Sequence, residues 1–147
     1  MKDAFRLQDL DPRRLGKIFD QAFMEIAFDE DGDLVVCDEI EVLVRAYEEQ
    51  DLIRYESSFG SSAAHLDVVS FINGFNRETN MVKAYVGEDK DEDGDWVVTF
   101  EYDVKVYPKE SVSAATLVRV ARDFAGAVRH GIAEVDDGTV FPGDDDA

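Results

Sequence analysis

One stretch, Val68 to Val86, changes its hydrophobic period within a single short connection. Its first half places apolar residues three and four positions apart, at Val68, Phe71, Ile72 and Phe75. That spacing is the apolar stripe of a helix. From Met81 onward apolar and polar residues alternate, which is the period of a strand. The sequence therefore predicts a central helix that feeds directly into a hairpin, so the fold must combine helices with strands.

The same two periods recur along the chain. Helical patterns run from Pro12 to about 25, from about 63 to 75 and from Ser111 or Ser113 to 131. Strand patterns cover 26–28, 34–37, 42–47, 52–59, 81–86 and 96–106. Asp11 followed by Pro12 is a strong helix start, because the Asp side chain can cap the first amides. The order α-β-β-β(β)-α-β-β-α predicts an α+β fold in which three helices pack on an antiparallel sheet of five to six strands.

A chain of 147 residues fits one domain. We expect this domain to span residues 1–133. The segment 134–147 has no hydrophobic period and ends in a block of aspartates, which predicts a flexible acidic tail.

The formal net charge is −19, and it is unevenly distributed. Residues 25–60 hold twelve acidic and two basic residues, whereas residues 1–24 and 111–133 are slightly positive. Direct binding of nucleic acid is disfavoured, because phosphate recognition needs clustered Lys and Arg. The field would instead attract a basic protein, such as a nucleic-acid-binding protein. A salt-rich cytoplasm that selects acidic surfaces is an equal alternative.

The cellular compartment is predicted from the N-terminal sequence, the length of the apolar runs and the cysteine content. No signal-peptide pattern follows Met1, and no run of apolar residues is long enough to span a membrane. The single cysteine, Cys37, cannot form an internal disulfide. We expect a cytoplasmic protein without a membrane partner.

Motifs that would carry catalysis or bind a metal are weak. Asp89, Asp91 and Asp93 precede Gly94 as in the first half of a calcium loop, but Phe100 stands where a bidentate Glu is required. An acidic hairpin tip is the simpler interpretation of these weak metal candidates. The two histidines lie in different predicted helices, and the serines lack a nucleophile motif. We predict no enzyme, no metal and no cofactor.

Several segments together resemble the YbjN family over residues 11–132. They are the acidic hairpin 29–33, the helix end F-I-N-G-F-N-R-E at 71–78, M-V-K-A-Y-V at 81–86, the strand 96–106 and the helix from Ser113. The resemblance implies a fold similar to type III secretion chaperones. It also implies a non-enzymatic protein, often dimeric, that takes part in regulation or holds a partner protein.

Surface residues for such a role can be named from the pattern. We predict that aromatic residues of the sheet either contact a protein partner or lie in the core: Tyr47, Tyr55, Phe59, Tyr85 and Trp96. A stripe of small residues on the last helix is the predicted homodimer interface: Ala114, Val118, Ala121 and Ala125. Asn73, Asn76 and Arg77 either form a polar contact surface or satisfy the helix end and link it to the next strand.

Two functional hypotheses follow. The first is a chaperone-like or regulatory adaptor that binds a basic protein. The second is a sensor in which calcium at the acidic hairpins, or a small ligand, shifts a bound state.

Overall fold

The computed structural model describes residues 3–143, and the chain divides into two compact units. Among the described residues, the first unit comprises 3–57 and 102–125, and the second comprises 58–101 and 126–143. The chain passes from one unit to the other three times, within the long strands and the last helix.

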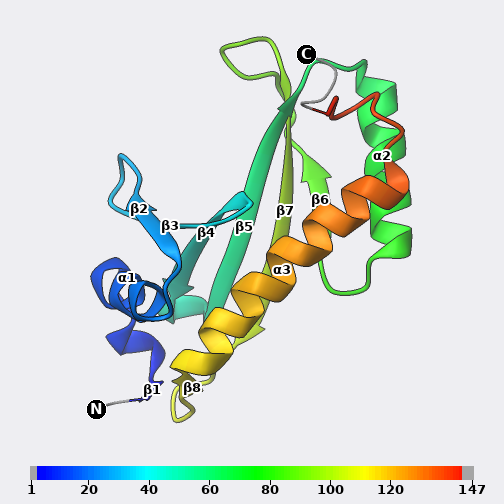
Figure 1. The fold of residues 1–147 in the computed structure, drawn as a ribbon. Coiled ribbons are helices and arrows are strands. Elements are labelled where there is room, and N and C mark those ends of the chain that lie inside the picture. The colour runs from blue at the N-terminus through cyan, green and yellow to red at the C-terminus, as the bar shows by residue number, and fades with distance from the viewer. Residues whose placement is uncertain (1–2, 144–147) are drawn as a thin grey trace. The chain divides into compact units, whose positions relative to one another are not determined.

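Apart from the short strands β1 and β8, the helices and strands follow the predicted order along the chain (Figure 1). The helices are α1 (Pro12–Gln21), α2 (His65–Glu78) and α3 (Ala114–Val135). The main sheet contains β2 (Glu25–Phe28), β3 (Leu34–Asp38), β4 (Ile40–Tyr47), β5 (Leu52–Ser61), β6 (Lys83–Val86) and β7 (Trp96–Lys105), in the order β2-β3-β4-β5-β7-β6. The α+β prediction is confirmed. A small second sheet of β1 (Ala4–Phe5) and β8 (Val112–Ser113) was not predicted, because two residues carry no period.

In the first unit, α1 lies against the β2-β3 hairpin. Asp11 caps α1 as predicted, with its Oδ1 accepting the Arg14 amide at 2.7 Å. The strands pair antiparallel, with Val36 opposite Val42 and Val44 opposite Tyr55. Alternate side chains of these strands are fully buried, which is what their period-two pattern requires.

Helix α1 ends earlier than its apolar period predicts, at Gln21. The Phe23 amide donates to the Asp20 carbonyl and the Met24 amide donates to the Phe19 carbonyl. These two bonds form a Schellman motif, which requires a left-handed residue at Phe23. Its φ is +63°. The motif turns the chain into β2, so the apolar residues beyond 22 belong to the turn and the strand.

The second unit is organised around a cluster of phenylalanines. The ring of Phe100 on β7 lies 4.8 Å from Phe75 and 6.2 Å from Phe71, both on α2, measured between centroids. The Asn76 amide joins α2 to β6, because it donates to the Ala84 carbonyl at 3.0 Å and accepts the Ala84 amide at 2.8 Å. The helix end was predicted to form either a polar contact surface or a link to the next strand, and the Asn76 bonds support the link.

The predicted boundary at residue 134 is wrong for the described part of the chain. Helix α3 continues to Val135, and the Asp136 carboxylate then accepts the amides of Val140 and Phe141. Val140 is buried, and the Phe141 ring packs 5.3 Å from Phe71. Residues 134–141 therefore belong to the second unit, because Val140 and Phe141 pack on its hydrophobic core. Asp144, Asp145 and Asp146 lie outside the described residues.

Gly131 does not end α3, as its place in the sequence suggested, but lies inside the helix. A Cβ at this position would overlap the ring of Phe75. The glycine therefore allows α3 and α2 to approach closely within the second unit.

We predict that Gly131→Ala lowers the free energy of unfolding by about 1–2 kcal/mol, because overpacking exceeds the gain in helix propensity. Gly126→Ala is the matched control, since it lies in the same helix with open space around its Cβ position. This control should raise the free energy of unfolding by up to about 1 kcal/mol. Urea denaturation measures both, and equal effects of the two substitutions would contradict the close approach.

Candidate protein-binding surfaces

The pentapeptide D-E-D-G-D occurs twice, at 29–33 and 91–95, and folds the same way both times. Asp29 Oδ1 accepts the amides of Asp31 and Asp33 at 3.0 and 2.9 Å. Asp91 Oδ1 accepts the amides of Asp93 and Asp95 at the same two distances. The glycine is left-handed in both, with φ of +83° at Gly32 and +81° at Gly94. We call these segments the acidic turns.

Each acidic turn presents fixed negative charge to solvent. The first aspartate is held by backbone amides, whereas the two middle acids are exposed: Glu30 and Asp31 in one turn, Glu92 and Asp93 in the other. Sequence analysis predicted two acidic hairpin tips but missed that they are identical. A comparison of the chain with itself would have found the repeat.

The two arginines among residues 25–60 are engaged within the chain. Arg54 binds Asp103 with two bonds of 2.8 and 3.0 Å, and Arg45 contacts Glu56 at 3.3 Å and Asp33 at 3.9 Å. The ring of Tyr47 lies 5.5 Å from one guanidinium and 5.4 Å from the other. The predicted contact residue Tyr47 is half-buried in this cluster. Arg45 contacts the first acidic turn through Asp33, while Glu30 and Asp31 of that turn stay exposed.

The predicted contact residue Tyr55 lies in the core. Its side chain is fully buried, and its hydroxyl donates to the Leu117 carbonyl at 3.0 Å. Burial raises the pKa of Tyr55 far above its ordinary value, and the nearby Tyr102 raises this pKa further. Tyr55 therefore cannot touch a partner, and its role is to connect the sheet to α3 within the first unit.

The other predicted contact aromatics all lie in the second unit. Phe59 is half-buried between Phe100 and Phe141, at 5.8 Å from each ring. Trp96 is half-buried and its ring lies 4.4 Å from the His65 ring. Tyr85 is exposed, and its hydroxyl donates to Glu101 at 3.1 Å. Tyr85 and the exposed part of the Trp96 side chain are accessible to solvent, so their role in partner binding stays a prediction.

Three carboxylates of the first acidic turn come close together. Oxygens of Asp29, Asp31 and Asp33 lie within 4.8 Å of one another. The predicted candidates Asp89, Asp91 and Asp93 do not gather in this way within residues 3–143. A cation at the first turn would compete with the Arg45 guanidinium for Asp33.

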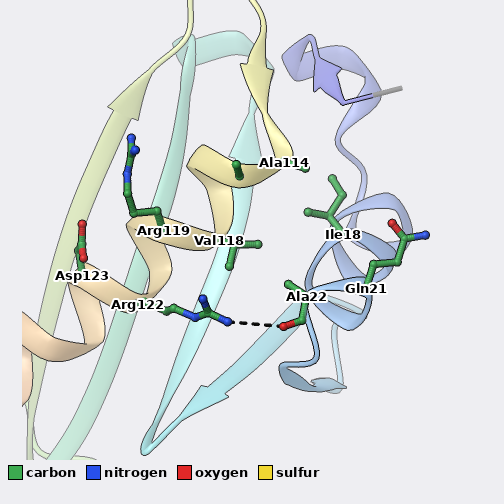
Figure 2. Close-up of a pocket in the computed structure, with 9 residues that line it drawn as sticks. Ile18, Gln21, Ala22, Ala114, Val118, Arg119, Arg122 and Asp123 are labelled. Atoms are coloured by element: carbon green, nitrogen blue, oxygen red, sulfur yellow. Dashed lines mark hydrogen bonds between the residues drawn. The ribbon is translucent and has the colours of Figure 1, made fainter. Parts of the chain in front are cut away.

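Helices α1 and α3 enclose an open groove of about 440 Å³ in the first unit. Helix α1 and its end contribute Ile18, Gln21 and Ala22, and α3 contributes Val118 and two arginines, Arg119 and Arg122. Figure 2 shows Val118 facing α1 across the groove and Arg122 reaching the Ala22 carbonyl, at 3.5 Å. We call it the α1-α3 groove.

The predicted dimer stripe divides between the core and this groove. Ala121 and Ala125 are fully buried within the chain, so a partner cannot reach them. Ala114 and Val118 line the α1-α3 groove. The homodimer itself stays a prediction.

Comparison with known proteins places the fold in a class. No known family profile matches the sequence, and a search of curated proteins finds no relative. Among solved structures, the chain is similar to an α+β protein that is described as a candidate transcription regulator. That protein is YbjN from E. coli, with a TM-score of 0.70 and 13% identity over 89% of this chain and 95% of the YbjN chain. The chain therefore has the YbjN-like fold that its motifs predicted.

A membrane-spanning helix is not found among the described residues.

We predict that Tyr55→Phe lowers the free energy of unfolding by about 1 kcal/mol, because a buried hydrogen bond is lost. Tyr107→Phe, at a largely exposed tyrosine, should change it by less than about 0.5 kcal/mol. Above about pH 10 the unfolded chain releases the Tyr55 proton while the folded chain retains it, so stability falls as pH rises. Urea denaturation at neutral and alkaline pH should show a smaller alkaline loss in Tyr55→Phe than in the wild type.

Proposed function

We propose that this protein is a non-enzymatic regulatory adaptor that holds a basic segment of a protein partner, such as a nucleic-acid-binding protein. The observation that carries the proposal is the repeated acidic turn. One folded chain contains two copies of a rigid loop whose middle acids point into solvent.

Rigid, repeated carboxylates suit recognition of basic segments. The backbone amides fix each turn before a partner arrives, so little conformational entropy is lost on binding. Charges arranged in this way steer association and select partners by sign. The similarity to YbjN, described as a candidate transcription regulator, supports a regulatory role.

The arrangement of potential catalytic groups favours binding over turnover. The His65 ring packs against Trp96 at a tilt of 45°, and His130 lies on the α3 surface, 3.8 Å from Glu134. Neither histidine is placed beside a nucleophile by a hydrogen bond in the described residues. The α1-α3 groove is lined by aliphatic side chains, two arginines, one glutamine and one aspartate, which do not form an acid–base pair or a nucleophile site.

We predict that neutralising the exposed acids of one turn weakens capture of basic proteins. The variant Glu30→Gln with Asp31→Asn keeps Asp29, so the turn retains its hydrogen bonds. In pull-downs from native lysate, its yield of basic proteins should fall about fivefold, and rising salt should weaken wild-type capture because salt screens exposed charges.

The matched control is Glu48→Gln with Glu49→Gln, which removes the same charge from the short helix Glu48–Gln50 between β4 and β5. The yield of basic proteins with this control should stay within about twofold of the wild-type yield, since salt screens charges that lie outside the binding site. Equal losses in both variants would mean that total charge, and not the acidic turns, holds the partner.

A cation sensor is the second candidate, favoured by the approach of Asp29, Asp31 and Asp33. Oxygen ligands of this kind suit calcium. This function differs from the adaptor because the bound ion, and not a protein, would change the state of the chain.

If the sensor hypothesis holds, millimolar calcium raises the melting temperature, because a ligand that binds the folded form stabilises it. Asp31→Asn should abolish the rise, while Asp93→Asn in the other acidic turn should preserve it. A melting temperature that is identical with calcium, magnesium and chelator would reject the sensor.

A further inference from the structure

Phe23 occupies the position at a helix end where glycine is the usual residue. A left-handed backbone is unfavourable for a bulky side chain and free of steric cost for glycine. The Phe23 side chain is nevertheless 97% exposed. Burial of the Phe23 ring therefore contributes almost no stability that could offset the unfavourable φ of +63°. An aromatic group held in water by a strained backbone indicates a surface that another molecule covers.

The α1-α3 groove begins at the residue before Phe23, because Ala22 lines it. Apolar contacts within the groove come from Ile18, Ala22 and Val118. Phe23 itself does not line the groove, but it follows Ala22 directly in the chain and is exposed next to this end of the groove. A groove between two helices with an aromatic residue at its end matches the way in which proteins hold an amphipathic helix.

The charged residues that line the groove are Arg119, Arg122 and Asp123 on α3, so the lining has a net positive charge although the whole chain is at −19. The three bases of α1 line a different pocket. Arg119 makes no hydrogen bond or ion pair within residues 3–143, and Arg122 makes one long bond to a backbone carbonyl. At physiological salt, charges beyond about 8 Å are largely screened, so these local bases decide which ligand the groove attracts.

We propose that the α1-α3 groove docks an acidic amphipathic helix of a partner protein. Its apolar face covers Phe23 and the groove floor, and its carboxylates meet Arg119 and Arg122. Phenylalanine and arginine are both enriched at protein interfaces relative to the rest of the surface. A second copy of this chain is the competing occupant, and sedimentation of the full chain separates it from a partner helix. The inference is independent of the proposed function, since that function concerns basic segments at the acidic turns.

The proposal is tested by selecting a random library of 16-residue peptides on the immobilised full chain. Enriched peptides should combine Asp or Glu with apolar residues at helical spacing. Fluorescence anisotropy with the consensus peptide should then give a Kd that rises about tenfold in Phe23→Gly, Arg119→Glu and Arg122→Glu.

Matched controls separate docking from folding and from net charge. Lys109→Glu makes the same charge change in an exposed loop, and Leu66→Ala removes another exposed apolar side chain. Both should leave the Kd within twofold. Phe23→Gly should also raise the melting temperature by about 2–4 °C, because the left-handed position then costs nothing.

Four outcomes would overturn the proposal. The first is that enriched peptides are basic or share no consensus. The second is that the consensus peptide binds Phe23→Gly as tightly as the wild type. The third is a dimer in sedimentation that Phe23→Gly and Arg122→Glu both dissociate without peptide, in which case a second copy occupies the groove. The fourth is a lower melting temperature in Phe23→Gly, which would show that Phe23 stabilises the fold.

Discussion

A single hydrogen-bond pattern, in which one aspartate oxygen accepts two backbone amides, shapes both acidic turns. Asp29 and Asp91 each close a loop of five residues, and the left-handed glycine completes the reversal. The first turn also sets the register of its hairpin, with Phe28 opposite Leu34. Because the first aspartate of each turn accepts the backbone amides, the side chains of the middle acids remain exposed to solvent. The negative potential of the loops therefore follows directly from the way the loops fold.

At the end of α1, in contrast, the residue that is exposed on the surface is one that lowers the stability of the fold. The Schellman bonds require a left-handed residue, and glycine would provide it without strain. The chain places Phe23 there instead, with its ring in water. Residues that oppose stability in this way are often retained for function. The observation connects backbone geometry to the groove beside it, and so to a proposed docking surface.

The two proposed surfaces differ in the chemistry that each would recognise. The acidic turns hold rigid carboxylates, while the α1-α3 groove combines apolar contacts with two arginines. Local charge, and not the net charge of −19, governs what each surface attracts at physiological salt. An adaptor with surfaces of opposite sign could hold a basic and an acidic segment at once. This arrangement is consistent with a regulator and does not require catalysis.

The sequence by itself determined the α+β class, the order of the elements and the start of α1. These features depend on residues only a few positions apart, such as the cap that Asp11 provides to Arg14. The same patterns placed the acidic hairpins, so part of the candidate site could be predicted. The aromatic contact residues could not be sorted, because alternation cannot tell the buried Tyr55 from the exposed Tyr85.

Tertiary structure alone decided the features that join distant segments. The packing of Phe75 against Gly131 converts an expected helix end into a helix interior, and the core takes up Val140 and Phe141 from an expected tail. The exposure of Phe23 and the groove beside it also depend on α1 meeting α3, about a hundred residues along the chain. Local sequence sets the backbone preferences, but burial is a property of which segments meet, and that is settled when the whole chain packs.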